Sequence, residues 1–254
     1  MRLRLVVAYD GTDFSGFATS PGFRTVAGEI TNALERISGD SVALTCAGRT
    51  DAGVHASGQV VTVDVEAPSL SAGDLGHRID RMVGPEVSIL SADEVGSDFD
   101  ARRSARMRRY RYTILNRAAG DPLLRRTTWH VRSPVLDLEA MTEAARALVG
   151  THDFSSFCRR IVVRTDGGGR RELDRTREVL ETAWIDLGDD LIRFDVGARS
   201  FCQQMVRSVV GSLVTVGSGT QPPEWFVELL AARDRNTAGP VAPPQGLCLW
   251  EVVY

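Results

Sequence analysis

Two hydrophobic periodicities alternate along the chain, and their order limits the fold more than any other feature of the sequence. Leu3, Leu5 and Val7 recur at every second position, which predicts a half-buried strand. Residues 26–37 repeat apolar side chains at helical spacing and are followed by Gly39, which predicts a helix and its end. The order strand, helix, strand, strand, helix, strand then roughly recurs. It predicts an α+β protein of two ferredoxin-like subdomains, each with antiparallel or mixed strands and helices on one face.

The remaining segments complete this two-part scheme. Further strands are expected at residues 42–46, 61–66, 109–115, 178–187, 191–198 and 247–254, and further helices at 71–83, 138–148, 201–216 and after Pro222-Pro223. The glycine-rich residues 165–175 are expected to form a flexible surface loop. We therefore expect an N-terminal subdomain at 1–105 and a C-terminal subdomain at 106–254.

The basic residues exclude several classes of enzyme. All 30 of them are arginine, because the sequence contains no lysine. A P-loop NTPase, a protein kinase and an enzyme that forms a Schiff base each need a lysine, so none of these is expected.

Cysteine and histidine spacing indicates a cytoplasmic protein without a metal. The four cysteines form no CxxC pair and the four histidines no HExxH motif, so we expect neither a zinc site nor a disulfide framework. Cysteines among apolar neighbours are typical of reduced thiols in the cytoplasm. The N-terminal apolar run is too short for a signal peptide, and no apolar run of about 20 residues could span a membrane.

Charge is distributed very unevenly, although the net charge is only −3. Residues 64–100 carry nine acids against two arginines, whereas residues 101–132 carry ten arginines against one acid. A second arginine cluster lies within residues 159–177. Guanidinium groups fit phosphates in two-point contacts and stack on bases, so these clusters favour a nucleic-acid surface over an ordinary solvated face.

A loop of small residues at 47–58 carries the chemistry-bearing side chains. Its glycines and alanines let the backbone approach a ligand closely, and Asp51 lies at its centre with Arg49 two residues before it. The same residues also fit a plain turn in which Asp51 bonds only the backbone. His55 is compatible with a general base or with a structural role.

Arg207 is the one cation on the expected helix 201–216, whose other faces are largely apolar. A buried charge without a partner costs roughly 3–5 kcal/mol, so we expect Arg207 to face a carboxylate or a phosphate. Asp51 is one candidate for that partner, and Asp195 or another acid would serve equally well on sequence grounds.

Six motifs in order resemble the tRNA pseudouridine synthase A family. The most specific is the Ala47–Ala56 stretch AGRTDAGVHA. The others are Tyr9–Gly16, Ala101–Tyr112, His152–Phe154, Met205–Leu213 and Ala242–Leu247. The chain departs from the family pattern at Phe17, Ala18, Ala27, Asp80 and Asp100, and none of these positions is Asp51, Tyr110 or Arg207.

The resemblance implies an isomerase that converts uridine to pseudouridine at positions 38, 39 and 40 of the tRNA anticodon stem-loop. It implies Asp51 as the catalytic nucleophile and a flipped-out base in a cleft between the subdomains. It also implies a homodimer and no cofactor. Substrate-binding residues would be Tyr110, Arg207, Arg49 and His55. The arginine cluster at residues 101–132, and not the resemblance, gives the candidate RNA-binding residues Arg102, Arg106, Arg108, Arg109 and Arg111.

Two other functions stay open at this point. One is an RNA-binding protein without catalysis, in which Asp51 is only structural. The other is an enzyme that excises a base or transfers a ribosyl group with Asp10, Asp13 and Asp51 together. Free uracil among the products would identify the latter, whereas pseudouridine in a nucleoside digest would exclude it.

Overall fold

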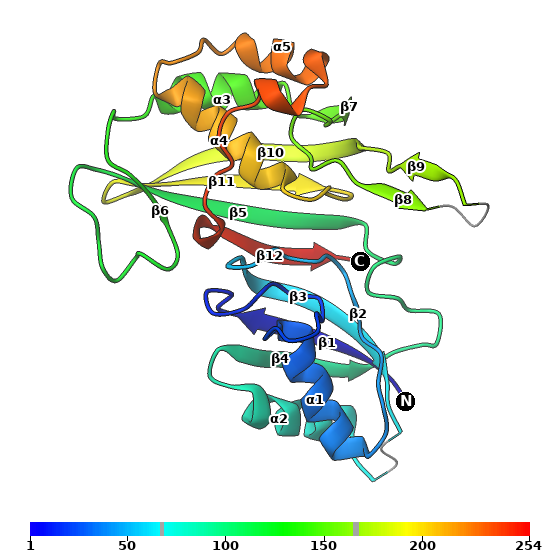
Figure 1. The fold of residues 1–254 in the computed structure, drawn as a ribbon. Coiled ribbons are helices and arrows are strands. Elements are labelled where there is room, and N and C mark those ends of the chain that lie inside the picture. The colour runs from blue at the N-terminus through cyan, green and yellow to red at the C-terminus, as the bar shows by residue number, and fades with distance from the viewer. Residues whose placement is uncertain (67–68, 165–167) are drawn as a thin grey trace. The chain divides into compact units, whose positions relative to one another are not determined.

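A computed structural model describes residues 1–66, 69–164 and 168–254, which form two compact units (Figure 1). The first unit contains Met1–Arg109 and Leu247–Tyr254, and the second contains Tyr110–Gly246. Both units combine a β-sheet with helices, so the predicted α+β class is confirmed. Among the described residues, no helix is both long and apolar enough to span a membrane.

The first unit combines five strands with two helices. Its strands are β1 (Arg2–Tyr9), β2 (Thr45–Cys46), β3 (His55–Asp64), β4 (Val87–Glu94) and β12 (Leu247–Val253), and its helices are α1 (Val26–Ser38) and α2 (Ala72–Val83). The order is β4-β1-β3-β12, with the short β2 also on β3. β1 is antiparallel to β3 and β4, and β12 is parallel to β3. Every second residue of β1 is buried, as the periodicity predicted.

Local chemistry fixes the ends of α1. The Thr25 hydroxyl accepts a hydrogen bond from the Gly28 N–H at 3.2 Å and caps the first turn. Gly39 ends the helix in a left-handed conformation with φ of 81°, which glycine adopts without steric cost. Ile30 and Leu34 are fully buried on the inner face of the helix.

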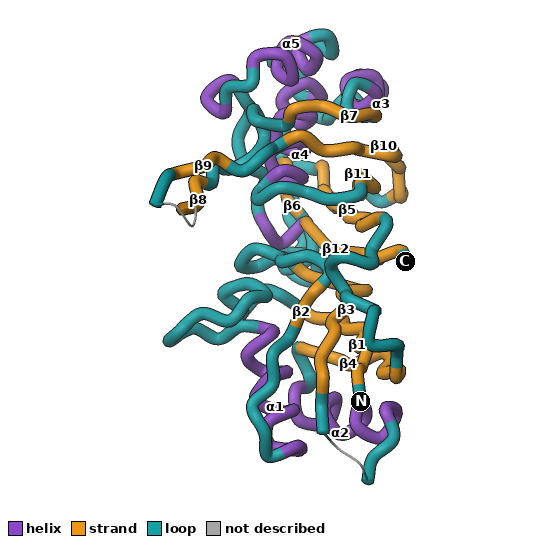
Figure 2. The backbone as a smooth tube through the Cα atoms, turned by 90° about the vertical axis from the view of Figure 1, so that its right-hand side faces the viewer, coloured by secondary structure: helices purple, strands orange, loops and turns teal. Residues whose placement is uncertain are grey.

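The second unit also combines strands with helices, but they follow one another along the chain in a different order (Figure 2). Its strands are β5 (Met107–Asn116, in this unit from Tyr110 on), β6 (Trp129–Val131), β7 (Gly150–Asp153), β10 (Thr176–Gly188) and β11 (Leu191–Ala198). Its helices are α3 (Leu138–Arg146), α4 (Met205–Gly217) and α5 (Trp225–Ala232), followed by the short turns Arg235–Thr237 and Pro244–Gly246. The strand order is β5-β11-β10-β7, with β6 beside β5. A separate hairpin pairs β8 (Val162–Arg164) with β9 (Arg170–Glu172).

Several expected elements differ from the structure. α4 begins at Met205 and not at residue 201, because Gln204 has φ of 65° and cannot continue a right-handed helix. The expected loop 165–175 contains the strand β9, while its residues 165–167 lie outside the described residues. β3 begins at His55, so the expected loop 47–58 is four residues shorter. β4 was not predicted.

The C-terminal strand is the largest difference from the expected division. The element order placed residues 247–254 in a subdomain at 106–254, whereas β12 pairs in parallel with β3 of the first unit. The boundary within β5, between Arg109 and Tyr110, lies four residues beyond the expected one. Whether 1–105 and 106–254 act as domains stays a prediction.

Two of the four cysteines are paired. Cys158 and Cys202 form a disulfide, with their Cα atoms 5.7 Å apart. The expectation of four reduced thiols is therefore wrong for this pair, which is 44 residues apart in sequence. Spacing rules did not reveal it because only the fold brings the two residues together. Cys46 and Cys248 do not belong to this disulfide.

Tyr112 gives a prediction about stability at high pH. Its ring is fully buried in the second unit, and its hydroxyl donates to the Pro243 carbonyl at 2.8 Å. Burial raises the pKa of Tyr112 far above its usual value of about 10. The unfolded chain therefore loses this proton first, and the free energy of unfolding falls as pH rises above about 10. We expect Tyr112 to contribute up to about 1.4 kcal/mol per pH unit to that fall.

Urea unfolding of the wild type and Tyr112→Phe between pH 7 and 11.5 measures this contribution. Lysine deprotonation cannot obscure it, because the chain has no lysine. Burial also raises the pKa of Tyr254, so the variant should keep part of the slope. The same slope above pH 10 in both proteins would contradict the prediction.

Candidate active site

Asp51 lies in the short loop between β2 and β3 of the first unit. Its side chain is half-buried, while Arg49 is exposed and Thr50 is buried. The Asp51 carbonyl oxygen accepts a hydrogen bond from the Val54 N–H at 3.2 Å and closes a turn. Gly53 has φ of 77° within that turn, a conformation that favours glycine. The local sequence thus presents the carboxylate at a tight bend.

The segment after β1 holds this loop by its backbone. A Cβ atom on Gly11 would lie 2.0 Å from the Val54 carbonyl oxygen, so only glycine fits there. The Phe17 N–H donates to the Thr50 carbonyl at 3.1 Å. The hydroxyls of Tyr9 and Thr50 are 2.8 Å apart in a buried hydrogen bond. The residues on both sides of the Asp51 bend are therefore fixed in place.

His55 is part of the same support. It is 8% exposed, and its Nδ1 accepts a hydrogen bond from the Gly11 N–H at 3.1 Å. The Asp10 carboxylate lies 3.2 Å from the same Nδ1 and also accepts from the backbone N–H of Thr12. These contacts favour the structural interpretation of His55.

Arg108 and Gln59 hold the start of the loop. The Arg108 guanidinium donates to the carbonyl oxygens of Ala47 at 2.9 Å and Arg102 at 2.7 Å, and the residue is only 8% exposed. The fully buried Gln59 amide donates to the Gly48 carbonyl at 2.5 Å. The expectation that Arg108 binds RNA is thus at odds with the structure, because its donors face backbone carbonyls inside the unit.

The other predicted RNA-binding arginines differ in their surroundings. Arg102 and Arg106 are exposed. Arg109 forms an ion pair with Glu251, and Arg111 lies 3.4 Å from the Asp195 carboxylate. A role in binding RNA stays a prediction for these four residues.

Arg207 is held on α4 of the second unit by a backbone segment. Its Nε donates to the Ala242 carbonyl at 2.7 Å, and the Ala242 N–H donates back to the Arg207 carbonyl at 3.0 Å. A Cβ on Gly211 would lie 1.7 Å from the Pro240 carbonyl oxygen, so the segment lies directly on the helix. Asp195, one candidate partner of Arg207, instead pairs with Arg193 at 2.7 Å.

Tyr110 packs against a residue that sequence reasoning had assigned only to an apolar helix face. The ring of Tyr110, 7% exposed, meets that of Phe201 edge to face, with centroids 5.0 Å apart and planes at 85°. Phe201 therefore positions the Tyr110 ring. Phe201 lies four residues before Met205, which is helical spacing. The sequence therefore did not distinguish a residue of the helix from a residue that packs against Tyr110.

Phe201→Leu should lower kcat by about 2- to 10-fold, because an edge-to-face contact contributes about 0.5–1.5 kcal/mol. Steady-state kinetics on tRNA, the substrate that the motif resemblance implies, measures this loss. The matched control is Phe226→Leu, which removes a ring from the Phe157–Phe226 stack of the same unit. Equal kcat values for both variants would show that Phe201 contributes only to packing and does not affect kcat through the Tyr110 ring.

The predicted site residues are divided between the two units. Asp51, Arg49 and His55 belong to the first unit, whereas Tyr110 and Arg207 belong to the second. The cleft in which they would meet stays a prediction. Among the described residues, no group of three or more His, Cys, Asp or Glu side chains is arranged to hold a metal ion.

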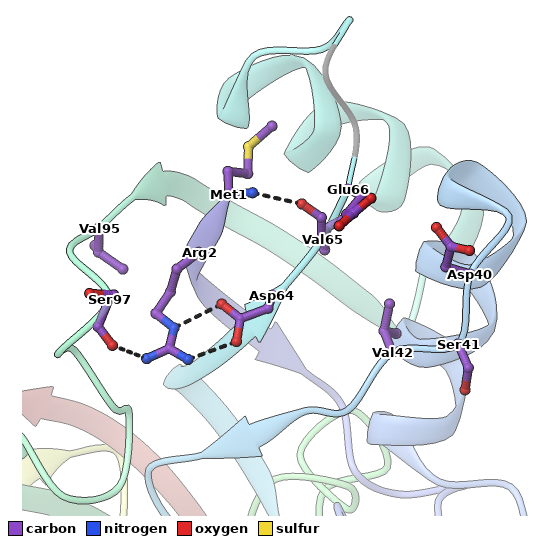
Figure 3. A pocket seen from close by; sticks show the side chains of 10 residues that line it. All are labelled: Met1, Arg2, Asp40, Ser41, Val42, Asp64, Val65, Glu66, Val95 and Ser97. Atoms are coloured by element: carbon purple, nitrogen blue, oxygen red, sulfur yellow. Dashed lines mark hydrogen bonds and ion pairs between the residues drawn. The ribbon is translucent and has the colours of Figure 1, made fainter.

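A pocket of the first unit lies apart from these residues (Figure 3). The Arg2 guanidinium on its wall donates to both oxygens of Asp64 at 2.7 and 2.8 Å, and the Met1 ammonium donates to the Val65 carbonyl at 2.8 Å. The charged groups of Arg2, Asp64 and Met1 thus bind partners within the pocket wall, which gives them a structural role. None of the predicted site residues lines it.

The chain thus combines an α+β fold, an aspartate at a glycine-bordered bend and a strand rich in arginine. A family model described as tRNA pseudouridine synthase matches residues 5–102 and 144–254. The chain therefore belongs to the tRNA pseudouridine synthase family, and the resemblance drawn from the motifs is confirmed.

Curated relatives named tRNA pseudouridine synthase A support this assignment over the full chain. The relative from Myxococcus xanthus is 41% identical and is matched over 100% of this chain and 92% of its own length. The relative from Halalkalibacterium halodurans is 42% identical, with 97% and 90% covered, and that from Streptomyces avermitilis is 43% identical, with 100% and 88% covered.

Proposed function

We propose that the protein isomerises uridine to pseudouridine at positions 38, 39 and 40 of the tRNA anticodon stem-loop, with Asp51 as its catalytic residue. The observation that carries the proposal is the fixed bend at Asp51, held through Gly11, Phe17 and Arg108. A carboxylate held in one place is what an attack on a single bound nucleotide needs.

The isomerisation breaks the N1–C1′ bond and forms a C5–C1′ bond. The proton on C5 leaves and N1 gains one, so no water, oxidant or other reactant is consumed. Three roles for Asp51 fit this balance: attack at C1′, addition at C6, or removal of the 2′ hydrogen. All three need an ionised carboxylate at a fixed position.

The base must leave its stack before these atoms can be reached. The exposed Arg49, next to the bend, and the exposed Arg102 and Arg106 would hold phosphates around the extruded nucleotide. The Tyr110 ring would cover the flipped uracil, and Arg207 would hold the Asp51 carboxylate ionised.

The proposal also includes the assembly and its place in the cell. The resemblance to the family supports a homodimer in which both copies contact the tRNA. Because tRNA is modified where it is made and used, we expect the protein in the cytoplasm.

Nucleoside analysis of unmodified tRNA after incubation with the pure protein tests the proposal. We expect pseudouridine in transcripts with uridine at positions 38–40 and none when those positions carry cytidine. Free uracil would instead favour base excision, and an unchanged digest would favour RNA binding without catalysis.

A further inference from the structure

The hairpin of β8 and β9 carries three arginines of the second cluster, Arg164, Arg170 and Arg171, and the proposed chemistry does not use it. The two strands form their own two-stranded sheet, which extends away from the main strands of the second unit in both views (Figures 1 and 2). Exposed side chains dominate it, including Ile161, Val162 and Leu173. An isolated pair of strands is marginally stable in water, so packing alone does not explain why the chain keeps it.

The charges on the hairpin are only partly neutralised. Glu172 accepts from Arg160 at 3.0 Å and also pairs with Arg175. Arg164, Arg170 and Arg171 are exposed, and in the part of the chain that the structure describes they form no ion pair. Three guanidinium groups therefore face solvent on one small hairpin.

Strand register places two of these charges opposite each other. Arg164 pairs directly with Arg170, so both side chains lie on the same face at neighbouring positions. Like charges at such positions destabilise a strand pair. An anion that binds both guanidinium groups would remove this repulsion.

The composition of the hairpin indicates what kind of anion it fits. Residues 159–164 and 168–175 contain no asparagine, glutamine or aromatic side chain, so arginine is the main residue type there that could contact a nucleic acid. Guanidinium forks match the geometry of phosphate oxygens. The surface thus fits a phosphodiester backbone.

We propose that the β8–β9 hairpin binds the phosphate backbone of tRNA through Arg164 and Arg170, which lie on one face of it. This inference rests on the proposed function for the identity of the RNA. It adds a contact outside the residues assigned to the substrate, within the part of the chain that matches the family model.

The test compares Arg164→Gln/Arg170→Gln with the wild type by measuring tRNA affinity from 50 to 300 mM salt. Each phosphate contact contributes about 0.7–0.9 to the slope of log K against log salt. The variant should therefore lose about 1.4–1.8 from that slope and bind tRNA about tenfold more weakly at 100 mM salt. Its thermal midpoint should equal or exceed that of the wild type, because the facing charges are gone.

Two control variants keep the result specific. Arg164→Lys/Arg170→Lys preserves the charges and should keep most of the slope. Arg78→Gln/Arg81→Gln removes two exposed arginines from α2, within the acidic part of the chain, and should leave the slope unchanged.

Two results would overturn the proposal. One is a slope for the Gln variant equal to those of the wild type and the α2 control. The other is a loss of binding to phosphatidylglycerol vesicles with tRNA binding intact, which would assign the hairpin to a membrane surface. Failure of the proposed function would look different, because wild-type protein would then form no pseudouridine while the salt slopes were still measurable.

Discussion

Asp51→Asn should lower the rate of tritium release from C5-tritiated uridine in tRNA by at least about 10³-fold, while tRNA affinity changes by less than about threefold. The amide has nearly the shape of the carboxylate but can neither attack carbon nor take up a proton. Removal of a reacting group typically has effects of this size or larger. The half-buried side chain makes the substitution compatible with folding.

Asp13→Asn is the matched control for this prediction. Asp13 is an exposed carboxylate in the segment that supports the Asp51 loop, and the same change of charge there should leave turnover within about twofold. Near-wild-type turnover of Asp51→Asn would remove Asp51 from the mechanism. An equal loss in both variants would favour the alternative in which several carboxylates act together.

Gly11→Ala should lower turnover by about 10²-fold and the free energy of unfolding by about 1–3 kcal/mol. The new methyl group would lie 2.0 Å from the Val54 carbonyl oxygen, so the Asp51 loop must move away. A displacement of about 1 Å at a catalytic group can cost about 10²-fold in rate. Urea unfolding and single-turnover kinetics measure the two effects.

Gly73→Ala makes the same change where there is space. The nearest atom to a Cβ there is the Ser71 hydroxyl oxygen at 3.9 Å, and the residue lies in α2. It should raise the free energy of unfolding by about 0.5–1 kcal/mol and leave turnover unchanged. If Gly11→Ala behaved like Gly73→Ala, the backbone of the loop would not be what positions Asp51.

Local periodicity predicted most elements of the fold because their signals lie within a few residues. α1 followed from its apolar spacing and from Gly39. Pairing between strands far apart in sequence was harder to predict. β12 pairs with β3, which lies nearly 200 positions earlier, and the residues of β12 do not indicate which strand it pairs with. The helix start at Met205 was misplaced because Phe201 continues the helical spacing while serving Tyr110.

The site could be predicted in part, for similar reasons. A carboxylate among small residues singled out Asp51 as a candidate. Arg108 was assigned to RNA on charge alone, although it lies in phase with the buried Tyr110 and Tyr112 on one strand. That alternation was the signal that placed its side chain inside. The close approach of Gly11 to Val54 depends on two segments meeting, so a single sequence does not reveal it.

The most direct test of the account is the stoichiometry of the wild-type reaction on tRNA that carries C5-tritiated uridine. If the protein isomerises uridine, one tritium is released to water for each pseudouridine formed, and no free uracil accumulates. Tritium that stays with the base, or free uracil without pseudouridine, would contradict it.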